Sequence, residues 1–404
     1  MKPSSNLVIQ ACQHGFDPGR LNGYLSRKDG WSSEDFNIKK VTAFMLAAGA
    51  VVLLLLGSFS CGQNETEEIG VGVVVPLTGP LSSNGLQMKN GMELALGEIN
   101  ESPLLGGKEI RFIVEDSEGT PDGAERAYRK LIEQDGVVAV LGPFTSSATE
   151  RIIPVAQQNK VVAFSPTSAA RGLSARSEFA FRASLTVDPL VQADVMVTRE
   201  QLRYDNVATI VNEADAFSSS NHEKVKEELE KHGVRVVSEQ TYSRPTGALP
   251  DLTGQLTDII NAVPLPEALF ISALAPGRRG VMTQARRLGM DMNIPFLVTL
   301  ATQDDVREAA DAAEGAITFT TWIADIDTPE NRRFLENFRA KYGEPDAFAA
   351  LSYASTYILA EAIADASSTD PEAIRDAMAD IRADTLLGES SILTVTGTRF
   401  TNRL

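Results

Sequence analysis

Short aliphatic runs alternate along the chain with longer stretches in which apolar positions recur at helical spacing. A run of about five apolar residues suits a buried strand and is too short for a helix. The predicted strands are 69–75, 110–115, 137–141, 161–164, 179–182, 207–211, 234–239, 268–272, 294–298 and 315–319. The predicted helices are 86–100, 123–134 capped by Asp122, one opened by residues 145–147, one starting at 186–189, 221–232, 252–261, 280–288, 329–342, 347–366 and 371–381. Such alternation predicts an α/β fold of parallel sheets covered by helices on both faces.

The stretch 137–170 predicts a strand–helix–strand unit that carries two loops rich in hydroxyl groups. One loop holds Thr145, Ser146 and Ser147 at the start of the helix, and the other is residues 165–168. Because the crossover between parallel strands is right-handed, both loops leave the carboxyl edge of the sheet, where α/β folds bind ligands. Free N–H groups at the helix start favour an anion there. The alternative is that these hydroxyls only cap the helix.

The strand–helix pattern runs through two similar halves, before and after about residue 185. Each half is long enough to form a compact unit with its own core. We therefore expect two doubly wound parallel-sheet lobes with a hinged cleft between them. Residues 69–185 and 324–383 are assigned to the first lobe, and residues 186–323 and 384–404 to the second.

The first part of the chain carries the features of an exported protein. Residues 1–40 show no clear periodicity and end in two lysines, so they are an N-terminal extension, either a short tail or a start-site artefact. Residues 41–61 form an uncharged, largely apolar run with small residues before Cys61, which are the parts of a secretory signal. Residues 62–68 read as a polar, acidic tether.

Two interpretations of this apolar run stay open. Its end, Gly57-Ser58-Phe59-Ser60-Cys61, resembles a bacterial lipoprotein signal, which implies that Cys61 is lipidated and becomes the mature N-terminus. The run is also long enough to remain as an uncleaved signal anchor. Both interpretations place the rest of the chain outside the cytoplasm, because the lysines flank the inner side. We expect a periplasmic or cell-surface protein that is anchored to the membrane.

The composition argues against several classes of function. The net charge of −17 and the absence of a basic stripe argue against a nucleic acid as a partner. The chain has three histidines and two cysteines, Cys12 and Cys61, so the mature part has no cysteine for a metal site or a disulfide. It also lacks a nucleotide-binding glycine motif after the first strand. We expect no enzyme activity, no cofactor and no metal.

Several motifs occur together in a particular order along the predicted first lobe. Together they resemble the type I periplasmic binding proteins, specifically the branched-chain amino acid (leucine/isoleucine/valine) transporter family, over about residues 69–388. The resemblance implies a bilobal receptor that binds a small solute in its cleft and delivers it to an ABC permease in the inner membrane. The alternative is a membrane-tethered ligand-sensing receptor without a transport role. The motifs are Val75-Pro76-Leu77-Thr78-Gly79-Pro80, Asn90-Gly91 to Ile99-Asn100, Gly106-Gly107-Lys108, Asp116-Ser117, Gly142-Pro143-Phe144-Thr145-Ser146 and Ser165-Pro166-Thr167-Ser168.

The resemblance also implies the residues that bind the ligand. In the family, the serine that matches Ser146 takes the ligand carboxylate, and the second loop holds the α-amino group. Three positions depart from the family pattern: Ala169 replaces a common threonine, Phe217 a tyrosine, and Leu300 an acidic residue. The implied ligand-binding set is Asn84, Thr145, Ser146, Thr167, Ser168, Ala169, Phe217, Leu274 and Leu300.

These departures remove the groups that would hold an ammonium ion. An ammonium buried without a negative partner is costly, so we expect a small amino-acid-like carboxylate or a neutral amide rather than leucine. Arg278 and Arg279 are candidates for an anion contact from a loop facing the cleft, and the alternative is a solvated pair that caps the next helix. Trp322 packs either on the ligand or in the core. The chain stops at residue 404 where the family continues, so the last strands are trimmed or the reading frame ends early.

Overall fold

A computed structural model describes residues 67–245 and 250–391 of the chain. The extension 1–40, the segment 41–61 with Cys61, most of the tether and residues 392–404 lie outside the described part. The described residues belong to one compact unit, and this unit contains two five-stranded sheets.

The first sheet is entirely parallel and has the strand order β2-β1-β3-β4-β5. The order reverses between β1 and β3, and such a switch point is where open α/β sheets bind ligands. The strands are β1 (Glu68–Val75), β2 (Glu109–Asp116), β3 (Ala139–Leu141), β4 (Val162–Ser165) and β5 (Ala180–Arg182). The helices between them are α2 (Ser82–Asn100), α3 (Pro121–Glu133) and α4 (Ser146–Asn159), with the short turn η2 (Ser174–Arg176).

The second sheet repeats this topology, with the order β7-β6-β8-β9-β10. Its strands are also parallel, so all its loops to the following helices leave one edge. The strands are β6 (Asn206–Asn212), β7 (Arg235–Tyr242), β8 (Leu269–Ser272), β9 (Phe296–Thr299) and β10 (Ile317–Phe319). Its helices are α5 (Val187–Leu202), α6 (Ala216–Lys231), α7 (Thr253–Ile260), α8 (Ala275–Arg287) and α9 (Gln303–Ala309), followed by η3 (Ala310–Ala313). The expected fold class is confirmed.

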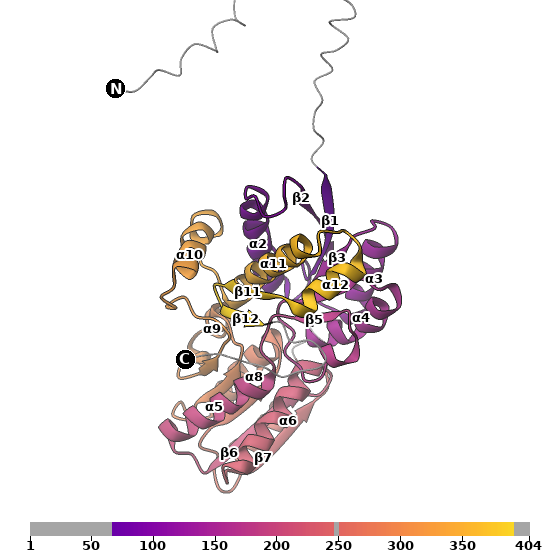
Figure 1. Cartoon of the computed structure of the whole chain (residues 1–404). Helices are drawn as coiled ribbons and strands as arrows, with labels where there is room; N and C mark the ends of the chain where they lie inside the picture. Colours follow the sequence, from indigo (N-terminus) through magenta and orange to yellow (C-terminus); the bar gives the residue numbers. More distant parts are fainter. Residues whose placement is uncertain (1–66, 246–249, 392–404) are drawn as a thin grey trace, which may run out of the picture. The chain divides into compact units, whose positions relative to one another are not determined.

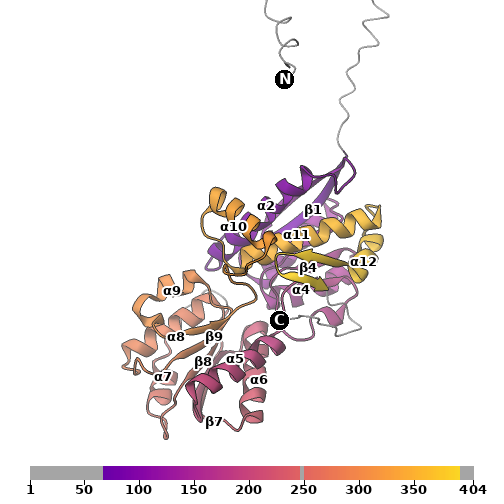
Figure 2. The same ribbon diagram turned by 60° about the vertical axis from the view of Figure 1, so that its left-hand side comes forward.

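The last helices return to the first sheet although they follow the second sheet in sequence. Figures 1 and 2 show α10 (Pro329–Tyr342), α11 (Ala347–Ala366) and α12 (Pro371–Asp380) alongside the first sheet. Their apolar residues are buried in the same core as those of β1 and α2. Among the described helices, α11 alone has the length and hydropathy of a membrane span, and 78% of its most apolar window is buried in this core. It is therefore a core helix.

A hairpin of β11 (Arg382–Thr385) and β12 (Gly388–Ser391) follows α12 and was not predicted. Leu386, between its strands, is 2% exposed and lies in the core of the first sheet. The second lobe was expected to resume at residue 384, whereas Leu386 packs against the first sheet.

Two helices begin further upstream than predicted. Thr120, not Asp122, caps α3, since its hydroxyl accepts a hydrogen bond from the Gly123 N–H at 3.0 Å. Helix α8 begins at Ala275, before the predicted residue 280, and proline is well accommodated in a first helical turn. Arg278 and Arg279 therefore lie inside this helix and not in a loop.

Candidate ligand site

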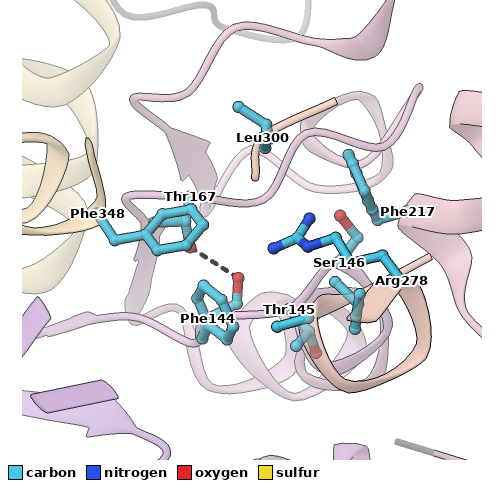
Figure 3. A pocket seen from close by; sticks show the side chains of 10 residues that line it. Phe144, Thr145, Ser146, Thr167, Phe217, Arg278, Leu300 and Phe348 are labelled. Carbon is cyan, nitrogen blue, oxygen red and sulfur yellow. Dashed lines mark hydrogen bonds between the residues drawn. The ribbon is translucent and has the colours of Figure 1, made fainter. Parts of the chain in front are cut away.

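Ten residues that follow the carboxyl ends of strands in both sheets, or begin α11, line one pocket (Figure 3). The cavity between them measures about 30 Å³, against about 300 to 1,000 Å³ for a typical small-molecule site. A ligand of amino-acid size therefore enters only if the two sides of the pocket move apart. The lining residues are Phe144, Thr145, Ser146, Thr167, Phe217, Leu274, Ala275, Arg278, Leu300 and Phe348.

The side formed by the first sheet centres on the start of α4. Thr145 is its N-cap, and the Thr145 hydroxyl accepts a hydrogen bond from the Ala148 N–H at 3.2 Å. The Ser146 hydroxyl accepts one from the Ala170 N–H at 3.1 Å, which leaves its own proton free to donate. Within the described part of the chain, the Ser146 N–H makes no hydrogen bond. Thr145 thus caps the helix, and Ser146 offers two donors at its positive end.

The second hydroxyl loop contributes less to the pocket than expected. Thr167 lines the pocket, and its hydroxyl donates to the Phe144 carbonyl at 2.7 Å, which joins the two loops. Ser168 is buried behind the pocket, where its hydroxyl lies 2.7 Å from that of Thr149. Ala169 is fully buried and packs in a core beneath the second sheet. Ser168 and Ala169 therefore support the loop and do not line the pocket.

The side formed by the second sheet is mainly apolar. Phe217 lies in the first turn of α6, Leu274 and Ala275 lie at the start of α8, and Leu300 follows β9. The backbone of Leu300 has φ of 60°, a left-handed conformation that leucine rarely adopts. The surrounding structure holds this strained residue against the pocket, which is a frequent property of ligand sites.

Arg278 is the charged residue of the pocket wall. Its side chain is buried, with Nε 2.9 Å from Oδ2 of Asp305 and Nη1 3.3 Å from the Thr299 carbonyl. Figure 3 shows its guanidinium extending into the space ringed by the other labelled side chains. Arg279 does not line the pocket, because it turns away to pair with Asp305 and Glu308. The alternative of a solvated pair is therefore wrong for Arg278, which is buried and ion-paired.

Two further candidates lie elsewhere. Asn84, in the first turn of α2, is 2% exposed and does not line the pocket. Trp322 belongs to the core, where its ring packs edge-on against Phe334 and its Nε1–H donates to Asn331 at 2.8 Å. The core interpretation of Trp322 is confirmed.

Sequence reasoning missed three of the lining residues. Phe144 and Ala275 adjoin candidates that had been identified, so adjacency was the available signal. Phe348 had no such signal, because it lies at the start of α11, about two hundred residues after Phe144. Its ring packs edge-on against Phe144 with the centroids 5.0 Å apart.

Hydrogen bonds and an ion pair beside the pocket join the part of the chain that contains the first sheet to the part that contains the second. The Ser147 hydroxyl lies 3.0 Å from Oδ2 of Asp215 and accepts a hydrogen bond from the Ala216 N–H at 2.8 Å. Burial raises the pKa of Asp215, although hydrogen bonds from nearby hydroxyl groups oppose this shift. Arg171 spans the same boundary with a bidentate ion pair to Glu227, whose pKa it lowers to about 2. The first turn of α4 thus contacts both the pocket, through Ser146, and the start of α6, through Ser147.

The remaining titratable groups give no sign of a metal site. In the ranges that the structure describes, no cluster of three or more His, Cys, Asp or Glu side chains is placed to hold a metal ion. His222, which was expected at the surface, is 7% exposed, and its Nε2 lies 3.0 Å from Glu239.

The chain has two sheets of the same topology, and residues that follow the carboxyl ends of strands in both sheets line one pocket. This arrangement defines a bilobal solute-binding protein of the α/β type. The family model of periplasmic binding proteins matches residues 68–402, and the chain belongs to this family. The expected family is confirmed. Its members bind solutes and are not enzymes, and they act outside the cytoplasm.

Individual proteins are similar to this chain in sequence or in structure, at low sequence identity. An amino acid binding protein of Pseudomonas aeruginosa is 24% identical over 347 residues, which cover 84% of this chain and 90% of the relative. The transporter substrate binding protein LivJ of Streptococcus pneumoniae, solved with isoleucine, has a TM-score of 0.74 at 23% identity, covering 80% of this chain and 92% of its own. A solute binding protein of Rhodopseudomonas palustris, solved with 3,4-dihydroxy benzoic acid, has a TM-score of 0.69 at 23% identity. The match covers 80% of this chain and 88% of that protein.

Proposed function

We propose that this protein is the solute-binding component of an ABC importer, which binds a small carboxylate or amide between two lobes and delivers it to a permease. The observation that carries the proposal is the pocket itself, because residues from both sheets line it. A ligand that contacts both sides favours the closed arrangement, so closure reports occupancy to a partner. Relatives named as transporter components support transport over the alternative of sensing alone.

The proposed lobes are residues 69–185 with 324–383, and residues 186–323. We propose that the ligand carboxylate lies at the start of α4, where Ser146 offers its N–H and hydroxyl proton. The rest of the ligand contacts Thr167, Phe217, Leu274 and Leu300.

The ligand class follows from the groups that the pocket lacks. Among the lining residues there is no carboxylate to pair with an ammonium ion. Leu300 stands where the resembled family has an acidic residue, and Asp305, a few residues further on, is turned toward Arg278. Two of the similar structures hold isoleucine and 3,4-dihydroxy benzoic acid, which share a carboxylate but not an amino group. The pocket suits the second chemistry better.

A ligand panel on the full-length chain tests this proposal. Thermal unfolding is followed with branched-chain amino acids, their keto acids, aromatic acids and short amides. A ligand at a thousand times its Kd stabilises the folded state by about 4 kcal/mol, which gives a clear rise in Tm. We expect this rise with acids or amides. Tight binding of leucine together with no binding of its keto acid would contradict the proposed ligand class.

Membrane attachment is a separate part of the proposal. A basic flank, an apolar run and Cys61 after small residues support a lipoprotein or a signal anchor. The intact mass of the protein extracted from membranes distinguishes the two. Loss of residues 1–60 with added acyl mass indicates lipidation of Cys61, and retention of those residues indicates an anchor. A full-length chain in the soluble fraction would exclude both.

A further inference from the structure

The ion pair between Arg278 and Asp305 lies where the pocket meets the core of the second sheet. Arg278 and Asp305 are 2% and 0% exposed, and a charge so deeply buried requires a partner. Both Nε and Nη2 of the arginine lie 2.9 Å from Oδ2 of the aspartate. This side-on contact orients the guanidinium, because it engages two of its three nitrogens on one edge.

Asp305 is itself held on several sides. The N–H of Thr302 donates to Oδ2 at 2.9 Å, and the two residues form the capping box at the start of α9. Nη1 of Arg279 lies 3.4 Å from Oδ1 of Asp305, and Nη2 of Arg279 lies 3.1 Å from Oε2 of Glu308. The carboxylate therefore faces the arginines and the helix start, and it does not line the pocket.

This arrangement sets the charge that a ligand meets. Arg278 is the lone ionised side chain among the lining residues. A guanidinium has five N–H donors, and its contacts with Asp305 and Thr299 engage three of them. Two donors have no partner in these contacts and remain for a ligand. A cationic ligand group is disfavoured here by like charge, and an anionic one gains charge-assisted hydrogen bonds.

The apolar wall defines the rest of the ligand. Phe144 and Phe348 form an edge-on pair, and Phe217 and Leu300 lie across the pocket from them (Figure 3). These side chains offer ring faces and edges and no further charge, which suits an aromatic or branched apolar body.

We propose that Arg278 selects a monoanionic carboxylate with an apolar body, and that Asp305 is the positioning residue that aims its guanidinium. The carboxylate lies between Arg278 and the start of α4. This inference rests on the proposed function and narrows it, because it chooses the acid over the neutral amide.

Matched acid and amide pairs test the selectivity of the full-length chain. The probes are benzoate, phenylacetate and 4-methylpentanoate, each beside its primary amide, with Kd measured by calorimetry. We expect at least one acid to bind at least tenfold more tightly than its amide. Equal binding of the acids and their amides would overturn this inference and leave the proposed function standing. A failure of the acids, the amides and the amino acids alike would overturn the proposed function as well.

Variants assign the selectivity to the ion pair. Removing Arg278 alone leaves a buried carboxylate, so the main variant is the neutral pair R278Q/D305N, which keeps hydrogen-bonding groups of similar size. It should bring acid and amide within about threefold of each other, whereas a structural role alone would weaken both equally. D305N should lower the preference for the acid, and D305E should restore part of it. An unchanged preference in R278Q/D305N that still unfolds cooperatively would overturn the assignment.

Discussion

Single residues at this site act through what they contact rather than through their type. Ser146 and Ser168 are both serines in hydroxyl loops, yet one lines the pocket and the other is buried behind it. Arg278 and Arg279 are neighbours in sequence, and one reaches the pocket while the other pairs with Glu308. The difference arises because successive side chains on a helix point in directions about 100° apart.

Asp194 is a buried carboxylate on α5 that does not line the pocket. Its two oxygens have no hydrogen-bond partner among the described residues, and burial raises its pKa to about 7. The folded state therefore favours the protonated form. Its contribution to stability is favourable near pH 4 and is lost as the pH rises toward 7.

Asp194→Asn should therefore raise Tm at pH 8 and raise it less at pH 5, because the amide stays neutral at both values. The amide is buried without a partner just as the protonated acid is, so the gain comes from the raised pKa, each unit of which corresponds to about 1.4 kcal/mol between the two protonation states. Thermal unfolding across this pH range measures it, with the exposed Asp258→Asn as the matched control. A gain that is independent of pH would contradict the titration of Asp194.

At the scale of elements, the strands were the easiest to predict. Each strand of the two parallel sheets was expected within a few residues, because buried parallel strands are continuous apolar runs. Helix α9 was missed because it is short and mostly polar, and its capping box is built on Thr302 and Asp305. The early start of α8 was missed for a related reason, since Arg278 and Arg279 look like surface residues until the ion pair is seen.

At the scale of the whole molecule, contacts outside the pocket hold its two sides together. Ser147 joins α4 to the start of α6, and Arg171 joins the loop after β4 to Glu227. These contacts need no ligand. We therefore expect them to favour the closed arrangement even when the pocket is empty.

Ser147→Ala should shift the ligand-free protein toward the open arrangement. The loss of a hydrogen bond of about 1 kcal/mol changes the ratio of open to closed forms by about fivefold. Small-angle scattering of the ligand-free protein should then give a larger radius of gyration. Ser219→Ala is the control, because it removes a half-buried hydroxyl near the start of α6 that donates to the nearby Glu213 carbonyl and does not reach α4. Identical scattering curves for the wild type and Ser147→Ala would refute this role of Ser147.

The sequence by itself determined the α/β class, the two sheets and the hydroxyl-rich start of α4 at the carboxyl edge of the first sheet. These depend on local periodicity and on the fixed geometry of parallel crossovers, which act over short distances along the chain. The tertiary structure alone decided that Phe348 meets Phe144 and that Asp305 is turned toward Arg278. Both contacts join elements that are separate in sequence, and burial of a charge beside its partner leaves no periodic signal in the chain.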